Sequence, residues 1–155
     1  MTPTAGANAA GPPARDQVTL IVDGANVMGS RANGWWRDRA GAMARLHDEL
    51  VVLAAHGVPV PPPGAEAAGR SAVPWFPHVL LVVEGKSRAA AGLVTADTRV
   101  EMVLAPGEGD DEIARLSGSV PGRRIVITAD QELRDRCRRA GAEVAGPRWL
   151  TGLLK

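Results

Sequence analysis

Carboxylates follow several apolar runs of this sequence, and they are the residues best suited to carry chemistry. Asp23 closes the run VTLIVD, Glu84 closes HVLLVVE, and Asp130 follows RIVITA. Asp110 and Asp111 follow VEMVLAPGEG. If these runs pair as parallel strands, their carboxyl ends meet at one edge of the sheet, which is where ligands bind in such folds. All of these acids then converge on a single edge.

Such a convergence of acids requires a counter-charge. Two like charges about 4 Å apart repel by roughly 4 kcal/mol at an effective dielectric constant of about 20. A hard divalent cation such as Mg²⁺ or Mn²⁺ is the simplest occupant, because it takes oxygen ligands and retains water. The pattern therefore predicts metal-assisted hydrolysis. The candidate metal ligands are Asp23, Asp110, Asp111 and Asp130, with Glu84 as an additional candidate.

Each acid also has a plain structural explanation. The sequence D-G-x-N, from Asp23 to Asn26, is a common turn signal, and an Asp at a helix start is a standard N-cap. A cap explains one of Asp110 and Asp111, but not two adjacent acids, and which of them binds metal stays open. Asn26 either holds the turn or orients a water bound to the metal.

The composition limits the possible classes of protein. The chain has 155 residues, of which 45% are apolar, and this suits one globular domain. A single cysteine, Cys137, excludes an intrachain disulfide and a Cys-based metal site. No apolar run is long enough for a membrane span, and the first residues do not resemble a signal peptide. We therefore expect a cytoplasmic protein without a membrane partner.

The order of apolar patterns predicts the fold. Strand-like runs alternate with helical spacing, which favours a three-layer α/β/α fold with a central parallel sheet of about five strands. Residues 1–16 are expected to be a disordered tail, residues 17–155 one domain, and residues 57–77 a Pro- and Gly-rich loop. We expect strands at 18–23, 78–84, 99–105, 124–129 and 143–145, and helices at 40–56, after Asp111, after Asp130 and from Pro147.

Arginine and tryptophan interleave soon after the first acid. The cations are sixteen Arg and two Lys at a net charge of +1, so a basic face can exist beside an acidic pocket, although a G+C-rich genome also explains the Arg content. Arginines for phosphates and aromatics for base stacking suit single-stranded RNA. The alternative is one core Trp with solvated arginines. The candidate RNA contacts are Arg31, Trp35, Trp36, Arg37 and Arg39, with Lys86 and Arg88 after Glu84.

A second basic run, RDRCRR from Arg134 to Arg139, is interpreted as a solvated helix face, with Cys137 buried. Arg123 and Arg124 stand at the start of a strand, opposite the acids, and are assigned no catalytic part.

These motifs resemble the NYN branch of the PIN-like nuclease superfamily over nearly the whole predicted domain. The first strand ends in D-G-x-N-V at Asp23 to Val27, an acidic helix start of the D-x-x-I kind spans Asp110 to Ile113, and S/T-x-D spans Thr128 to Asp130. The segments DGANVMGSRANGWWRDRAG, APGEGDDEI, VITADQELRDR and GAEVAGPRWL look most like an actinobacterial group of YacP-like proteins.

The resemblance implies a metal-dependent ribonuclease with Asp23, Asp110 or Asp111, and Asp130 as its acidic set. The chain departs from the family where a fourth acid often stands on a helix, and Glu84 or Asp38 are the available substitutes. Two other functions stay open. One is an RNA- or ribosome-binding module with weak or no catalysis, and the other is a phosphohydrolase of small phosphate esters.

Overall fold

Five short apolar segments form one parallel β-sheet, as the sequence predicts. The computed structural model describes residues 17–63 and 74–154, so the expected tail at 1–16 lies outside the described residues. The strand order is β4-β3-β2-β5-β6, and every neighbouring pair is parallel. The bounds are β2 (Val18–Asp23), β3 (His78–Val83), β4 (Val100–Leu104), β5 (Arg123–Ile127) and β6 (Glu143–Ala145).

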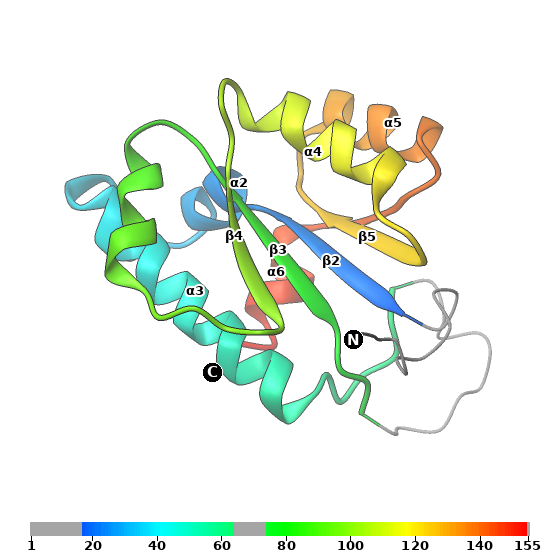
Figure 1. Ribbon diagram of the computed structural model, residues 1–155, viewed down its shortest axis with the longest axis horizontal. Coiled ribbons are helices and arrows are strands. Elements are labelled where there is room, and N and C mark those ends of the chain that lie inside the picture. Colours follow the sequence, from blue (N-terminus) through cyan, green and yellow to red (C-terminus); the bar gives the residue numbers. More distant parts are fainter. Residues whose placement is uncertain (1–16, 64–73, 155) are drawn as a thin grey trace, which may run out of the picture.

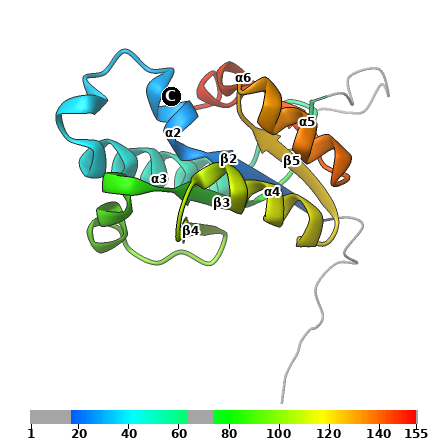
Figure 2. The ribbon, with the colours of Figure 1, turned by 90° about the horizontal axis from the view of Figure 1, so that it is seen from above.

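Helices cover both faces of this sheet and complete a three-layer α/β/α fold (Figures 1 and 2). Helix α3 (Arg39–His56) lies on one face with the 3₁₀ segment η4 (Gly85–Leu93) and the short helix α6 (Pro147–Thr151). Helices α4 (Gly109–Ser119) and α5 (Gln131–Arg139) lie on the other. Within the described residues, none of the helices has the length and apolarity needed to cross a membrane.

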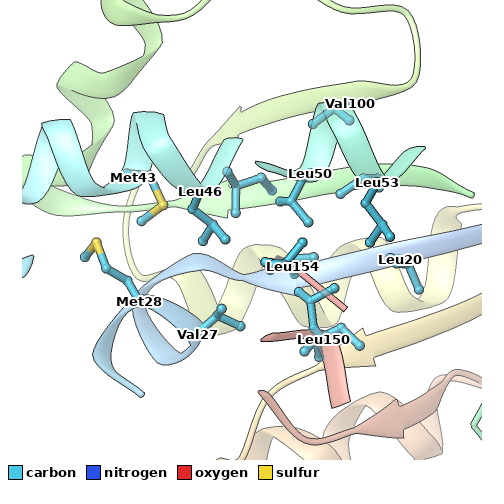
Figure 3. Packing of buried hydrophobic residues seen from close by; sticks show 14 of the residues in the cluster. Leu20, Val27, Met28, Met43, Leu46, Leu50, Leu53, Val100, Leu150 and Leu154 are labelled. Carbon is cyan, nitrogen blue, oxygen red and sulfur yellow. The ribbon is translucent and has the colours of Figure 1, made fainter. Parts of the chain in front are cut away.

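The larger part of the core lies between the sheet and α3 (Figure 3). Met43, Leu46, Leu50 and Leu53 recur at helical spacing on α3 and are all buried against strands such as β2, which contributes Leu20. Full burial of each such side chain contributes about 1.5–3 kcal/mol. The periodicity that predicted the helix therefore also fixes the face that it presents to the sheet.

A smaller core lies on the opposite face. Ile113 and Leu116 of α4 pack with Leu133 and Cys137 of α5 against the sheet, and all four are buried. The expectation that Cys137 is a small buried residue is confirmed. This packing fixes the rotation of both helices about their axes, and so decides which of their charged residues lie near the sheet edge.

The expected loop at 57–77 is closed at its base by regular contacts, and its middle part, 64–73, lies outside the described residues. Val58 and Trp75 form an antiparallel bridge. The Trp75 indole stacks on Trp149 with ring centroids 6.5 Å apart, and its Nε1 donates to the Val60 carbonyl at 2.7 Å. Trp75 therefore anchors the loop to the domain.

Candidate active site

Asp23 occupies the junction between the central strand β2 and the short helix α2 (Gly24–Gly29). The residue is only 8% exposed, and both carboxylate oxygens are hydrogen-bonded. Oδ1 accepts from the backbone N–H of Asn26 at 3.3 Å, and Oδ2 accepts from the hydroxyl of Thr128 at 2.8 Å. The D-G-x-N motif, which in isolation indicates a turn, thus starts a helix with Asp23 as its N-cap.

Burial raises the pKa of Asp23 because the charged carboxylate is removed from water. The hydrogen bonds from Thr128 and Asn26 favour the charged form and oppose this rise. The nearby carboxylates of Asp110 and Glu84 raise the pKa further. The charged form of Asp23 is therefore less favoured than that of a carboxylate in water, and such perturbed acids are typical of functional sites.

Two neighbouring strand ends are joined into one hydrogen-bonded unit. Besides donating to Asp23, Thr128 Oγ1 accepts from the backbone N–H of Asp130 at 3.2 Å. The Asn26 side-chain oxygen accepts from the backbone N–H of Ala129 at 3.0 Å. Asp130 Oδ1 caps α5 by accepting from the backbone N–H of Leu133 at 3.0 Å. The D-G-x-N and T-x-D motifs thus support each other's geometry.

Two further acids lie near Asp23. Glu84 follows β3, the strand beside β2, and Asp110 lies on α4, on the sheet face opposite α3. Glu84 directly follows β3, and its carboxylate accepts from the backbone N–H of Gly109, the first residue of α4. Asp110 follows in the first turn and is partly buried. Burial raises its pKa, and the charges of Asp130 and Glu84 raise it further. Glu84 therefore connects the sheet edge to the start of α4.

Asp110, and not Asp111, lies among the acids. Asp110 is coupled electrostatically to Asp23, Glu84 and Asp130. The Asp111 side chain is 72% exposed and forms an ion pair with Arg136 at 3.2 Å. We use the name "acid cluster" below for Asp23, Glu84, Asp110 and Asp130.

The acid cluster has the chemistry of a hard-metal site but is not assembled as one. Among the described residues, no group of three or more His, Cys, Asp or Glu side chains is arranged to hold a metal ion. Mg²⁺ is commonly bound through one or two carboxylates, with water and substrate phosphate completing its shell. The carboxylates of the acid cluster therefore suit Mg²⁺, because one or two of them can bind the ion directly while water and phosphate complete its coordination.

The predicted RNA-contacting segment lies next to α2, on the α3 side of the sheet. Within the 3₁₀ segment η2 (Trp35–Arg37), Trp36 is 55% exposed, and the Arg37 guanidinium lies 5.6 Å from the centroid of its ring. Trp35 packs partly against the core, with Arg39 over its ring at 5.4 Å. One Trp therefore stabilises the fold, and the other faces solvent.

The remaining predicted RNA contacts differ in exposure and in whether another side chain already binds them. Arg31 makes two hydrogen bonds to the Glu49 carboxylate, at 2.6 and 3.0 Å, so its guanidinium is held by α3. Lys86 and Arg88 are exposed on η4, which begins directly after Glu84. Of these three cations, the two on η4 are the more accessible.

The assignment of Arg123 and Arg124 to a structural role agrees with their positions. Arg123 makes a two-point ion pair with Glu143, and Arg124 donates to three backbone carbonyls. Both lie at the strand end remote from the acids.

Two arginines of α5, which the sequence predicted to be part of a solvated helix face, instead make contacts near the acidic edge. Arg134 Nε donates to the carbonyl of Thr128 at 2.9 Å. Arg136 pairs with Asp111. Both lie between the buried residues Leu133 and Cys137 of α5, and the run of arginines does not show which of its members approach the acids.

Comparison with known proteins supports the fold. No protein-family model and no curated protein matches the sequence. Among solved structures, the chain matches the crystal structure of Rae1 (YacP) from Bacillus subtilis with a TM-score of 0.56 and 18% sequence identity. The match covers 86% of this chain and 72% of the other. The two proteins share an α/β fold. At this identity the likeness is one of fold, so the function must be argued from the site.

Proposed function

We propose that this protein is a metal-dependent ribonuclease that hydrolyses phosphodiester bonds of RNA. The observation that carries the proposal is the acid cluster, whose side chains come from the ends of β2 and β3 and from the starts of α4 and α5. Hydrogen bonds through Thr128 and Gly109 join these strand ends and helix starts at one edge. They lie at the carboxyl edge of a parallel sheet, where this class of fold binds its ligands. The NYN/PIN-like fold supports the same conclusion.

Asp23, Asp110 and Asp130 would hold Mg²⁺ or Mn²⁺, with Glu84 beside them. When bound, such an ion lowers the pKa of a water molecule and stabilises the charge that develops on the phosphate. The role of the protein is to fix the acids in place. Thr128 holds the Asp23 carboxylate, and Asn26 ties the two acid-bearing turns together.

The RNA strand would reach this edge from the side of η2. Trp36 offers an exposed ring for stacking and Arg37 a cation beside it, while Lys86 and Arg88 add positive charge next to Glu84. A relationship to the actinobacterial YacP-like group and a cytoplasmic location are part of this proposal. The first rests on the sequence motifs and the second on the composition.

One observation favours a second candidate, an RNA- or ribosome-binding module with little catalysis. In residues 17–63 and 74–154, no group of three or more His, Cys, Asp or Glu side chains is arranged to hold an ion. On this alternative, the protein binds RNA without divalent metal and leaves it intact.

Cleavage of a 5′-labelled mixed-sequence RNA distinguishes the two candidates. Wild type, Asp23→Asn and Asp135→Asn are each assayed with Mg²⁺, Mn²⁺ or EDTA. Asp135 is the matched control because it is an exposed acid on α5 that pairs with Arg138. We expect cleavage by wild type and Asp135→Asn with metal, and none by Asp23→Asn or in EDTA. RNA binding without cleavage in every reaction would favour the binding module, and cleavage by pure Asp23→Asn would refute the assigned site.

A further inference from the structure

Arg136 lies where the α5 helix faces the start of α4, and most of its hydrogen-bonding capacity is unused. Its Nη2 donates to Asp111 Oδ1 at 3.2 Å. A guanidinium has five N–H donors. In the described part of the chain, Asp111 is the one acceptor found for Arg136, whose side chain is 38% exposed. A single contact thus orients the guanidinium and leaves four donors for a ligand.

The surroundings of Arg136 indicate the charge of that ligand. Arg136 pairs at 3.2 Å with Asp111, which directly follows Asp110 in the first turn of α4. The guanidinium is therefore beside the acid cluster. An acidic edge repels the phosphates of RNA, so a strand that crosses it requires cations placed at its rim.

The cations assigned so far lie on the other face of the sheet. Arg37 follows α2, and Lys86 and Arg88 lie on η4, both on the side that α3 covers. Arg136 belongs to α5, in the opposite helical layer (Figure 1). A strand held from both layers would pass over the carboxyl ends of β2 and β3, and so over the acids.

The Arg136–Asp111 pair contributes little to the stability of the fold. Asp111 is largely exposed and Arg136 is partly exposed, they share one contact, and such surface pairs contribute little to stability. The packing of α4 on α5 is already provided by buried Ile113, Leu116 and Leu133. Loss of the pair should therefore leave the fold intact.

We propose that Arg136, oriented by Asp111, binds a phosphate of the RNA strand at the acid cluster. This inference rests on the proposed ribonuclease function and assigns a different role to Asp111, which becomes a positioning residue and not a metal ligand. Planar two-point contact with phosphate oxygens is the interaction for which arginine is suited, so Lys should replace it only in part.

The test compares Arg136→Ala and Arg136→Lys with the control Arg138→Ala. Arg138 lies on the same helix in a similar exposed ion pair, with Asp135 at 3.4 Å. Binding of a short single-stranded RNA is measured in EDTA over a range of salt concentrations, and cleavage is measured with Mn²⁺. A charge-assisted hydrogen bond is worth about 1.5–3 kcal/mol, so Arg136→Ala should lower kcat/KM about 10- to 100-fold. It should also reduce the slope of log K against log salt concentration by about one.

The outcomes separate this inference from the proposed function. Normal behaviour of Arg138→Ala with a partial recovery in Arg136→Lys supports the phosphate contact. If wild type cleaves RNA but Arg136→Ala matches Arg138→Ala in both cleavage and salt slope, the inference is wrong and the ribonuclease proposal stands. If wild type fails to cleave with either metal, the ribonuclease proposal fails, and the role of Arg136 in catalysis fails with it.

Asp111→Asn tests the role assigned to Asp111. A positioning residue predicts a partial loss of cleavage, smaller than in Arg136→Ala, with an unchanged dependence on Mn²⁺ concentration. Complete loss of cleavage, or a requirement for much more Mn²⁺, would instead identify Asp111 as a metal ligand and overturn the assignment.

Discussion

At the scale of single residues, Asp23 is a buried acid whose negative charge is repelled by the nearby carboxylates of Asp110 and Glu84. Burial raises its pKa above the ordinary value of 3.8, against the hydrogen bonds from Thr128 and Asn26. A carboxyl group with a raised folded pKa destabilises the fold at pH values above that folded pKa, and this cost disappears below 3.8. The acid is thus retained at a cost to stability, as at many functional sites.

Asp23→Asn should therefore stabilise the metal-free protein at pH 7 by about 1 kcal/mol, the usual gain when such a group is relieved. The difference should disappear when the pH falls below 3.8, because the wild-type carboxyl is then protonated in both states. Urea unfolding in EDTA across this pH range measures it, with exposed Asp135→Asn as the unchanged control. A less stable Asp23→Asn at pH 7 would contradict the electrostatic account.

Thr128 is the second residue whose substitution is informative. Thr128→Val keeps the shape but removes the hydroxyl that donates to Asp23 and accepts from the Asp130 N–H. We expect a loss of about 1–3 kcal/mol in unfolding free energy, since buried polar partners are left unsatisfied. The pKa of Asp23 should rise further, which moves the pH profile of cleavage upward. Thr128→Ser should behave like wild type, and equal effects of Val and Ser would refute the role of the hydroxyl.

At the scale of elements, the connections of the sheet place the acids. Gly24 follows Asp23 directly, and a Cβ on Gly24 would lie 2.6 Å from the Val82 carbonyl oxygen and 2.9 Å from Met43 Cε. Because the first of these is backbone, neither β3 nor α2 can yield easily. The close approach of α2 to β3 therefore requires glycine at this position.

Gly24→Ala should destabilise the protein by about 1–3 kcal/mol, the usual cost of forcing extra volume into a packed region. It should also lower cleavage, because any shift of α2 moves Asn26 and its contact with the Ala129 N–H. Gly107→Ala is the matched control, since a Cβ there meets nothing within 4 Å. Thermal unfolding and cleavage of the two variants are compared, and equal stability would show that the α2 junction is not tightly packed.

The elements also explain which features the sequence revealed. Buried parallel strands are continuous apolar runs, so their ends, and hence Asp23 and Asp130, were predictable to within a residue or two. The sequence could not show that Asp110 and not Asp111 lies among the acids, because this depends on the exact rotation of α4 against the sheet. The position of Arg136 depends likewise on how α5 packs on α4, and a run of arginines gives no sign of it. The η4 segment after Glu84 was missed because its sequence, GKSRAAAGL, lacks a clear apolar period.

At the scale of the whole molecule, the candidate site lies where both helical layers meet the carboxyl edge of the sheet (Figure 1). The α3 layer contributes α2 and the exposed Trp36, and the opposite layer contributes the N-terminal turns of α4 and α5. Those two helix starts carry partial positive charge, which favours nearby anions and offsets part of the repulsion among the acids. The remaining repulsion is what a divalent ion would relieve.

Divalent metal should therefore reverse the order of stability of wild type and Asp23→Asn. A ligand that binds only the folded state stabilises it by RT ln(1 + [L]/Kd), about 2.7 kcal/mol at a hundred times the Kd. Mn²⁺ should thus raise the unfolding midpoint of wild type above that of Asp23→Asn, which we expect to be the more stable of the two in EDTA. Thermal unfolding of both proteins across a Mn²⁺ titration measures this crossing, with Asp135→Asn following wild type. An equal rise of the unfolding midpoint in wild type and Asp23→Asn would show that Mn²⁺ binds elsewhere. No change of the midpoint in either protein would show that the acid cluster does not bind Mn²⁺ in the absence of RNA.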